Sequence, residues 1–240
     1  MAEINGAQTA RRSIVKQQNL QTVLMRLLLA NAHTKVQRAV AQHTNILAIS
    51  GQKNAFSKIP AYGISVKSFK VPSKEELSHD FLWRVHKATP KKGEIKVFNR
   101  SHYEDVLVVR SLGFVSDDEA KRRFRLLNNF EEIVAENKTT ILKFYLHTSY
   151  EEQENRLHER MTNPEKHWKH NDGDWEMRKH WDKFRSYYQD LIDNCSAPFK
   201  WNIIPADENR WKEVLVLRKL VETLENLKLK YPKLETKMEE

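Results

Sequence analysis

A polar cluster follows a short apolar run near the middle of the chain. Residues 98–105, FNRSHYED, bring Arg100, His102 and Glu104 close together in the sequence. An arginine can clamp phosphate oxygens with two hydrogen bonds, and a carboxylate can hold a metal ion or a water molecule. Phosphate binding is therefore one interpretation of the cluster. A helix N-terminus with merely solvated charges is the other.

A second candidate stretch is residues 68–84, SFKVPSKEELSHDFLWR. Lys70 is expected at the carboxyl end of a strand, the edge where ligands bind in such sheets. His79, Asp80 and Arg84 form either a polar network that faces the same site or part of a structural helix with one His–Asp pair. Spacing alone favours the structural helix.

The third candidate region, residues 156–185, combines basic residues with tryptophans. Basic side chains on two helices that flank an exposed connection form a movable clamp, as in phosphotransferase lids. The same mixture is typical of single-stranded nucleic-acid binding, and a surface helical hairpin balanced by acidic residues is a third interpretation. The residues concerned are Arg156, Arg160, Lys166, Lys169, Arg178, Lys179, Lys183, Arg185, Trp168, Trp175 and Trp181.

Short β-branched runs alternate with long amphipathic stretches, and these elements must position the candidates. Strands are predicted at residues 45–50, 64–69, 95–98, 140–146 and 201–204. Helices are predicted at residues 18–42, 73–87, 117–137, 149–161, 175–194 and 208–229. This alternation is typical of a parallel sheet covered on both faces, so we predict a three-layer α/β fold. Ligands bind outside the carboxyl ends of the strands in such sheets, where the three candidates are expected.

Composition limits the class of protein. The chain has 240 residues, 40% of them hydrophobic, which is enough for one core, and a single domain over residues 1–240 is the default expectation. Its 41 Lys and Arg against 32 Asp and Glu give a formal charge of +9, which favours polyanionic partners. No apolar run is long enough to span a bilayer, and the N-terminus lacks a signal-peptide pattern. The single cysteine, Cys195, fits a reducing compartment, so we expect a cytoplasmic protein without a membrane partner.

Several of these stretches, in order and spacing, resemble the family-2 polyphosphate kinases. The resemblance covers about residues 46–229. It implies a P-loop-kinase-like fold with a parallel five-stranded sheet, an N-terminal helical segment at residues 1–44 and a helical lid at about residues 150–185. The matching motifs are residues 68–84, residues 98–105, LKFYLH at residues 142–147, residues 151–160, Trp168 with Lys169, Trp181, and IPAD at residues 204–207.

The resemblance implies phosphoryl transfer, dependent on Mg²⁺, between inorganic polyphosphate and an adenine or guanine nucleotide. The acceptor would be a nucleoside mono- or diphosphate of the AMP or ADP type, and the chain would form a homo-oligomer, either a dimer or a tetramer. The Mg²⁺ ligands stay unassigned. The residues assigned are Asn99, Arg100 and Glu104 as catalytic, Lys70, Arg84 and Arg100 as phosphate-binding, and Arg156, Arg160, Lys169 and Arg178 in the lid.

The sequence departs from the family pattern after the first predicted strand. Members carry G-x-D-x-x-G-K there, a loop that turns backbone N–H groups and a lysine onto phosphate. Counted from Gly51, the second glycine position is Phe56 and the lysine position is Ser57, so the loop is degenerate or deleted. The first hypothesis is an active kinase. The alternative is an impaired member that binds polyphosphate or nucleotide, or that regulates an intact partner.

Overall fold

Five strands form one sheet in the computed structural model, which describes residues 25, 27–28, 45–49, 64–111 and 113–230. The strand order is β2-β3-β1-β4-β5, and every neighbouring pair is parallel. Because parallel strands share a direction, their carboxyl ends meet at one edge of the sheet. The strands are β1 (Asn45–Ile49), β2 (Ile64–Ser68), β3 (Ile95–Asn99), β4 (Thr139–His147) and β5 (Trp201–Pro205).

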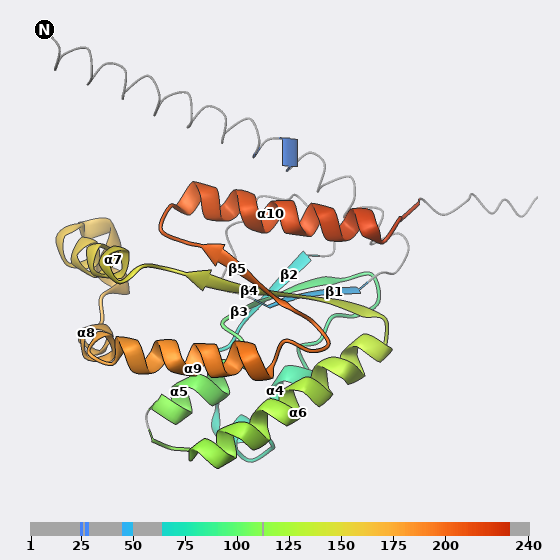
Figure 1. Cartoon of the computed structure of the whole chain (residues 1–240), viewed down its shortest axis with the longest axis horizontal. Helices are drawn as coiled ribbons and strands as arrows, with labels where there is room; N and C mark the ends of the chain where they lie inside the picture. The colour runs from blue at the N-terminus through green and yellow to red at the C-terminus, as the bar shows by residue number, and fades with distance from the viewer. Residues whose placement is uncertain (1–24, 26, 29–44, 50–63, 112, 231–240) are drawn as a thin grey trace, which may run out of the picture.

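Helices cover both faces of this sheet (Figure 1). Helix α10 (Asn209–Asn226) lies on one face and contributes Leu217 and Leu220 to a core cluster with the strands. Helices α5 (Glu104–Ser111), α6 (Asp117–Glu136) and α9 (Trp181–Asn194) lie on the other face. The predicted α/β fold is confirmed.

Local sequence explains the long helix α6. Ser116 caps its N-terminus, where the Ser116 hydroxyl accepts a hydrogen bond from the Glu119 amide at 3.2 Å. The buried residues Phe124, Leu127 and Phe130 recur at helical spacing and face the sheet. An apolar stripe of this width fixes which face of the helix is buried.

The prediction of one helix at residues 73–87 is wrong, because two short helices occupy this stretch. They are α3 (Lys74–Leu77) and α4 (Trp83–His86). The Ser78 hydroxyl donates to the Glu75 carbonyl at 2.7 Å, and the Asp80 carboxylate accepts from the Leu82 amide at 2.9 Å. Such side-chain bonds to the nearby backbone compete with helix formation and end the first helix.

The predicted lid region consists of helix α7 (Tyr150–Thr162), the 3₁₀ helix η1 (Pro164–Lys169) and helix α8 (Asp172–Arg178), followed by α9. The single helix predicted at residues 175–194 is therefore split between α8 and α9. The Asn171 side chain caps α8 by accepting from the Gly173 amide at 3.0 Å. Helices α7 and α8 stand beyond the carboxyl ends of β4 and β5 (Figure 1).

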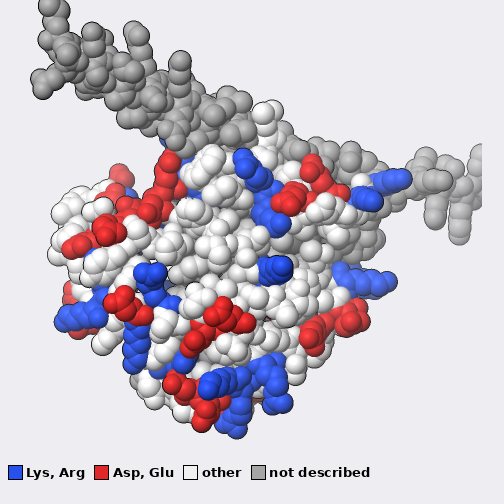
Figure 2. Space-filling view, viewed as in Figure 1, with Lys and Arg blue, Asp and Glu red and all other residues white. Residues whose placement is uncertain are grey.

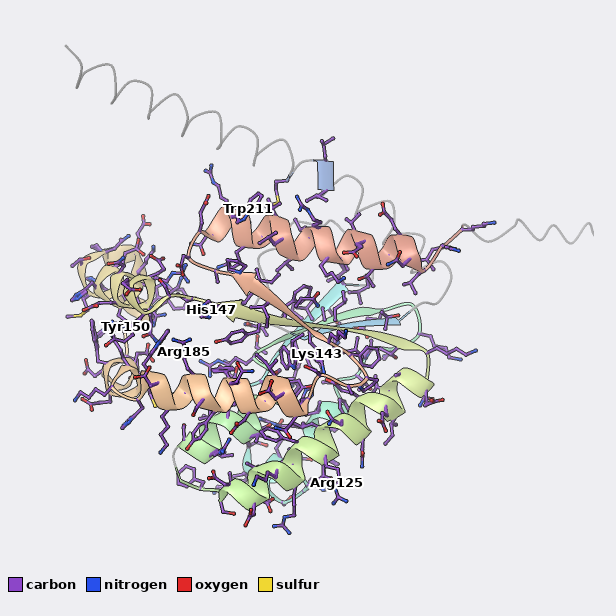
Figure 3. The ribbon with its side chains drawn as sticks, in the orientation of Figure 1. Arg125, Lys143, His147, Tyr150, Arg185 and Trp211 are labelled. Atoms are coloured by element: carbon purple, nitrogen blue, oxygen red, sulfur yellow. The ribbon has the colours of Figure 1, made fainter. Side chains whose placement is uncertain are left out.

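An interior cluster of polar groups lies between the sheet and helices α6 and α9 (Figure 3). The ammonium of Lys143 lies 2.8 Å from a Glu131 carboxylate oxygen and donates to the Cys195 carbonyl at 2.6 Å. The Tyr103 hydroxyl donates to the other Glu131 oxygen. Both charged side chains are fully buried, and burial lowers the pKa of Lys143 and raises the pKa of Glu131, while their attraction opposes both shifts.

His102 packs beside this cluster, fully buried between the rings of Tyr103 and Phe130. Neither of its ring nitrogens has a hydrogen-bond partner among the described residues. Burial, helped by the positive charge of Lys143, lowers the pKa of His102 to about 3, so the ring is neutral near pH 7. Although His102 belongs to the polar motif after β3, its side chain belongs to the core.

Two sequence predictions fall mainly outside the described residues. One is the N-terminal helical segment at residues 1–44, of which Met25 and Leu28 pack against the core beside α10. The other is the degenerate phosphate loop at residues 50–63. Among the helices that the structure describes, none has the length and apolar character needed to cross a membrane.

Candidate functional site

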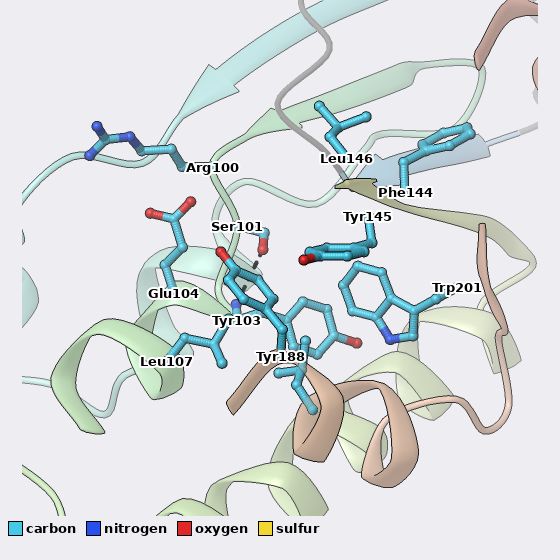
Figure 4. A pocket seen from close by; sticks show the side chains of 11 residues that line it. Arg100, Ser101, Tyr103, Glu104, Leu107, Phe144, Tyr145, Leu146, Tyr188 and Trp201 are labelled. Carbon is cyan, nitrogen blue, oxygen red and sulfur yellow. Dashed lines mark hydrogen bonds between the residues drawn. The ribbon is translucent and has the colours of Figure 1, made fainter. Parts of the chain in front are cut away.

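The turn after β3 holds the residue with the most unusual backbone near the sheet edge. Arg100 has a φ of +59°, in the left-handed region that non-glycine residues rarely adopt. Its side chain is exposed and extends toward the Glu104 carboxylate from the first turn of α5 (Figure 4). Burial raises the pKa of Glu104, although the Arg100 charge acts in the opposite direction. Lys138 and Lys228 also have a positive φ, so the backbone alone does not distinguish this turn. Its place at the carboxyl edge of the parallel sheet, where ligands bind in such folds, makes it the centre of the candidate site.

Asn99 joins the carboxyl ends of two neighbouring strands. Its side-chain amide donates to the Ser68 hydroxyl at 3.2 Å, which links β3 to β2. Lys70, two residues beyond β2, is exposed at the same edge of the sheet. The structure therefore brings the predicted residues Asn99, Arg100 and Lys70 to one edge, as parallel strands require.

Unlike the exposed Arg100, Arg84 is buried, with a side chain only 8% exposed. One guanidinium nitrogen lies 2.7 and 2.9 Å from the two carboxylate oxygens of Asp105, and another donates to the Lys70 carbonyl at 2.9 Å. The contact with Asp105 ties α4 to the start of α5, and the hydrogen bond to Lys70 ties it to the segment after β2. The geometry gives Arg84 a role in positioning the Arg100 turn, and direct phosphate binding by Arg84 stays a prediction.

The possible network of His79 and Asp80 with Arg84 is not formed. His79 instead stacks on the Trp83 ring with 4.0 Å between ring centroids, and Asp80 caps the Leu82 amide. The structural interpretation that spacing favoured is also wrong, because His79 and Asp80 lie between α3 and α4 and each contacts a different residue.

An aromatic chamber of about 180 Å³ opens beside the Arg100 turn (Figure 4). Its mouth carries the polar side chains of Arg100, Ser101 and Glu104. Aromatic and aliphatic side chains from the turn after β3 and from α5, β4, α9 and β5 make its walls. They are Tyr103, Leu107, Phe144, Tyr145, Leu146, Tyr188, Leu191 and Trp201.

Two tyrosines give the chamber its internal polar groups. The rings of Tyr145 and Tyr188 lie 5.0 Å apart, and both hydroxyls point into the space in Figure 4. Burial, with the negative charge of Glu104, raises the pKa of Tyr188 to about 12. Tyr188 is therefore a neutral hydroxyl over the whole range in which proteins work, able both to donate and to accept a hydrogen bond.

A second cavity, of about 370 Å³, lies between the lid and the sheet edge. Arg156 and Arg160 of α7 line it, and it shares Tyr145, Leu146 and Tyr188 with the aromatic chamber. The two cavities therefore adjoin, and the second adds Arg156, Arg160 and Asp174 to aromatic and aliphatic side chains.

Arg156 anchors the lid to the body of the protein. Its guanidinium donates to the Ala206 carbonyl at 2.6 Å and to the Asp207 carbonyl at 2.9 Å, just after β5. The Asp207 side chain accepts from the amide of Ser149, the residue that caps α7, at 2.8 Å. That hydrogen bond lowers the pKa of Asp207. The base of α7 is thus fixed to the turn that precedes α10.

Arg160 and Arg178 make their contacts within the predicted lid region. Arg160 lies 2.6 Å from the Asp174 carboxylate, which links α7 to α8. Arg178 is buried, with its guanidinium carbon 3.4 Å from the centre of the Tyr150 ring and a hydrogen bond of 2.8 Å to the Tyr150 carbonyl. Lys169 is exposed, 4.9 Å from the Trp168 ring.

Figure 2 shows basic and acidic side chains interspersed over the visible face rather than gathered by sign. Phosphate binding by Arg156 and Arg160, which line the second cavity, stays a prediction, as does a role for Lys169. The inward position of Arg178 favours bracing of the lid instead.

No group of three or more His, Cys, Asp or Glu side chains is arranged to hold a metal ion in the described part of the chain. Near the Arg100 turn, the Glu104 carboxylate and the Asn99 amide oxygen are candidate ligands. Mg²⁺ fits such a sparse set, because it keeps several waters and is commonly held by one or two carboxylates together with substrate phosphates.

Sequence reasoning missed the aromatic chamber. Tyr145 lies in the LKFYLH motif, whereas Tyr188 and Trp201 come from elements far along the chain. The signal that could have located Tyr145 is its place near the carboxyl end of a predicted parallel strand. No short-range pattern points to Tyr188, because its place in the chamber depends on how α9 packs.

A parallel α/β sheet carries Arg100 at its carboxyl edge and arginine-bearing helices beyond that edge, an arrangement compatible with a phosphotransferase. Comparison with known proteins makes the class more specific. The family model described as Polyphosphate kinase 2 matches residues 48–232. The chain belongs to this family.

The chain is similar to an AMP/ADP-polyphosphate phosphotransferase of Meiothermus ruber, with 47% identity over 185 residues, which cover 77% of this chain and 69% of the relative. It is also similar to an ADP-polyphosphate phosphotransferase of Rhodopseudomonas palustris, with 38% identity over 75% of this chain and 67% of the relative. Among solved structures, Polyphosphate Kinase 2 from Arthrobacter aurescens TC1 matches with a TM-score of 0.87 and 32% identity. That match covers 91% of this chain and 83% of the other.

Proposed function

We propose that this chain transfers phosphoryl groups between inorganic polyphosphate and a nucleoside mono- or diphosphate that carries adenine or guanine. The observation that carries the proposal is the strained Arg100 beside Glu104, at a sheet edge that the arginines of α7 overhang. The printed names of the M. ruber and R. palustris relatives support the same donor and the AMP and ADP acceptors.

Phosphoryl transfer needs positioning and charge stabilisation more than covalent chemistry. The Arg100 side chain is exposed, and its guanidinium is able to form two parallel hydrogen bonds with phosphate oxygens. Arg156 and Arg160 line the adjoining cavity from the lid side. A phosphate chain that lies between the turn and the lid would meet cations from both.

Mg²⁺ is part of the proposal. The Glu104 carboxylate and the Asn99 amide oxygen would be its protein ligands, and substrate phosphates and water would complete its shell. When bound, the ion would neutralise charge on the phosphate oxygens. The described residues themselves act by binding and orienting the phosphates through Arg100 and by holding the lid through Arg156.

The direct test is to incubate the purified chain with polyphosphate, Mg²⁺ and AMP or ADP, and to measure the phosphorylated nucleotide. Arg100→Ala should lower kcat by about a hundredfold or more, the size expected for loss of a group that stabilises charge in the transition state. Arg122→Ala is the matched control, because Arg122 is 71% exposed on α6, outside the site. Wild-type turnover that does not exceed that of Arg100→Ala would refute the proposal.

A second candidate follows from the sequence after β1, where Phe56 and Ser57 stand at the glycine and lysine positions of the family loop. An impaired member would bind polyphosphate or nucleotide without turnover, or would regulate an intact partner. It predicts polyphosphate binding that weakens between low and physiological salt, because exposed charges are screened. Multiple turnovers by the purified chain would reject this candidate.

Two further expectations are proposals of the same kind. A homo-oligomer, either a dimer or a tetramer, is expected by resemblance, and light scattering of the purified chain measures it. A cytoplasmic location is expected from the single cysteine, whose thiol is buried with its pKa raised by burial to about 12.

A further inference from the structure

The interior cluster shares one residue with the polar motif after β3. Tyr103 is only 1% exposed and lies in the chain between the exposed Arg100 and Glu104. Its hydroxyl donates to Glu131, and the Lys143 ammonium lies 3.3 Å from the same hydroxyl oxygen. Tyr103 therefore joins the buried charges to the segment that carries the candidate site.

Groups from α6, β4, α9 and β5 meet around the Tyr103 hydroxyl. Glu131 belongs to α6 and Lys143 to β4. Lys143 also donates to the Cys195 carbonyl at the end of α9, at 2.6 Å, and that carbonyl accepts from the Trp201 indole of β5 at 3.0 Å. Because these groups are bonded to one another in a close-packed interior, they fix the position of the hydroxyl relative to the sheet.

The Arg100 turn is short and is held at both ends. At its start, the Asn99 carbonyl accepts from the Phe69 amide at 3.2 Å, which continues the pairing of β3 with the segment after β2. At its end, the buried Tyr103 anchors the beginning of α5. The φ of +59° at Arg100 lies between these two anchors. Such a backbone persists where the surrounding structure holds it, so loss of an anchor should let the turn relax.

Stability alone is a weak explanation for the buried charges. A buried ion pair adds little net stability over apolar side chains of similar volume, because the cost of removing both charges from water offsets their attraction. Hydrogen bonds are directional, whereas apolar contacts are not. A hydroxyl held by a carboxylate therefore fixes the Tyr103 side chain more narrowly than apolar packing would.

We propose that Glu131 and Lys143 are positioning residues for phosphoryl transfer. They hold Tyr103, and Tyr103 in turn holds Arg100 and Glu104 at the sheet edge. The proposal rests on the proposed function and adds two residues that act from the interior, since both are fully buried. A displacement of about 1 Å at a reacting group can lower the rate about a hundredfold, so a small relaxation of the turn is enough.

Tyr103→Phe is the sharpest variant, because it removes one hydroxyl and keeps both the ring and the ion pair. With polyphosphate and AMP, its kcat should fall on the order of tenfold to a hundredfold while its KM for AMP changes by less than about twofold, since a misplaced Arg100 mainly weakens contacts made in the transition state. Tyr187→Phe is the matched control, because the Tyr187 ring contacts Arg110 in the last turn of α5. It should keep the wild-type kcat. A wild-type kcat in folded Tyr103→Phe would overturn the proposal.

A mutant cycle shows whether the ion pair acts through Tyr103. Glu131→Leu with Lys143→Met removes both charges, and Tyr103→Phe is then added to this double variant. If the pair acts through the hydroxyl, kcat falls in the double variant and the third change lowers it further by less than about twofold. An equal loss from Tyr103→Phe in both backgrounds would overturn the proposal.

Amide hydrogen exchange measures the turn independently of turnover. The Glu104 amide donates to the Ser101 carbonyl at 3.0 Å, and this bond should open more often when the anchor is lost. Exchange within residues 100–105 should become faster on the order of tenfold in Tyr103→Phe, with exchange in α10 unchanged. Unchanged exchange in the turn would overturn the proposal whether or not the chain is active. A wild type without turnover would reject the proposed function, and exchange would still decide whether the cluster holds the turn.

Discussion

The interior cluster and the lid both join a cation to a carboxylate, but they differ in their exposure to water. Lys143 and Glu131 are fully buried, whereas Arg160 and Asp174 of the lid are 31% and 39% exposed. A buried pair cannot exchange its partners for water, so each charge depends on the other. An exposed pair is worth little and is screened by salt, so its cation can be released to a ligand. The same kind of contact therefore fixes the fold in one region and leaves charge available in the other.

The largest expected effect comes from breaking the interior pair. Glu131→Leu leaves the Lys143 ammonium buried without its counter-ion, which should lower the free energy of unfolding by about 3–5 kcal/mol. Urea unfolding measures the change. The double change Glu131→Leu with Lys143→Met removes both charges and should recover most of the loss. Equal stability of the single and double variants would show that the pair is not coupled.

A smaller effect should come from His102, whose pKa is about 3 in the folded chain, below the value of about 6.5 of an unfolded chain. Between these values the unfolded state binds a proton that the folded state excludes. Stability should therefore fall as pH drops below 6.5, by about 1.4 kcal/mol per pH unit from this group. Above pH 6.5 the contribution is constant.

The variant His102→Leu lacks this proton uptake. Its stability relative to the wild type should rise by about 2–3 kcal/mol between pH 6.5 and pH 4.5, measured by thermal or urea unfolding at each pH. The wild type and the variant carry the same carboxylates, so the contributions of these groups to the pH dependence cancel in the difference. A difference that does not change with pH would show that His102 is accessible to protons in the folded chain.

The smallest effect on stability should come from the lid. Asp174→Asn removes the partner of Arg160 and should change the free energy of unfolding by less than about 1 kcal/mol. The freed guanidinium should nevertheless strengthen binding of polyphosphate several-fold at low salt, measured by calorimetry. Glu176→Gln is the control, since Glu176 pairs with Lys179 at the surface and lines neither cavity near Arg100. Equal gains in both variants would indicate a general charge effect.

Much of the fold was predictable because it depends on local patterns. Short apolar runs located the strands, and serine caps such as Ser116 located helix starts, since both effects act within a few residues. The break between α3 and α4 was missed because it depends on hydrogen bonds from the side chains of Ser78 and Asp80 to the nearby backbone. The spacing of hydrophobic residues gives no information about such bonds. Helix α5 begins within the polar motif itself at Glu104, where the sequence left solvated charges and a ligand site equally open.

The site was predictable only in part, for a physical reason. Arg100 and Glu104 lie four residues apart, directly after a predicted strand, so their place at the end of that strand could be inferred from the sequence. His102 lies between them and was grouped with them, but its side chain turns into the core, which only the packing of α6 decides. The sequence identified lid arginines such as Arg178 but not the direction of their side chains. The partners of Arg178 lie on α7, and only the packing of α7 against α8 brings them together.

The backbone at Arg100 has a consequence for engineering. At a φ of +59°, glycine is the residue that the backbone itself prefers, and an arginine there costs on the order of 1 kcal/mol. A library selected only for heat resistance would thus enrich glycine at this position. The most stable variants selected would be those that lack the guanidinium on which the proposed chemistry depends. At this one residue, a gain in thermal stability is therefore expected to cost activity.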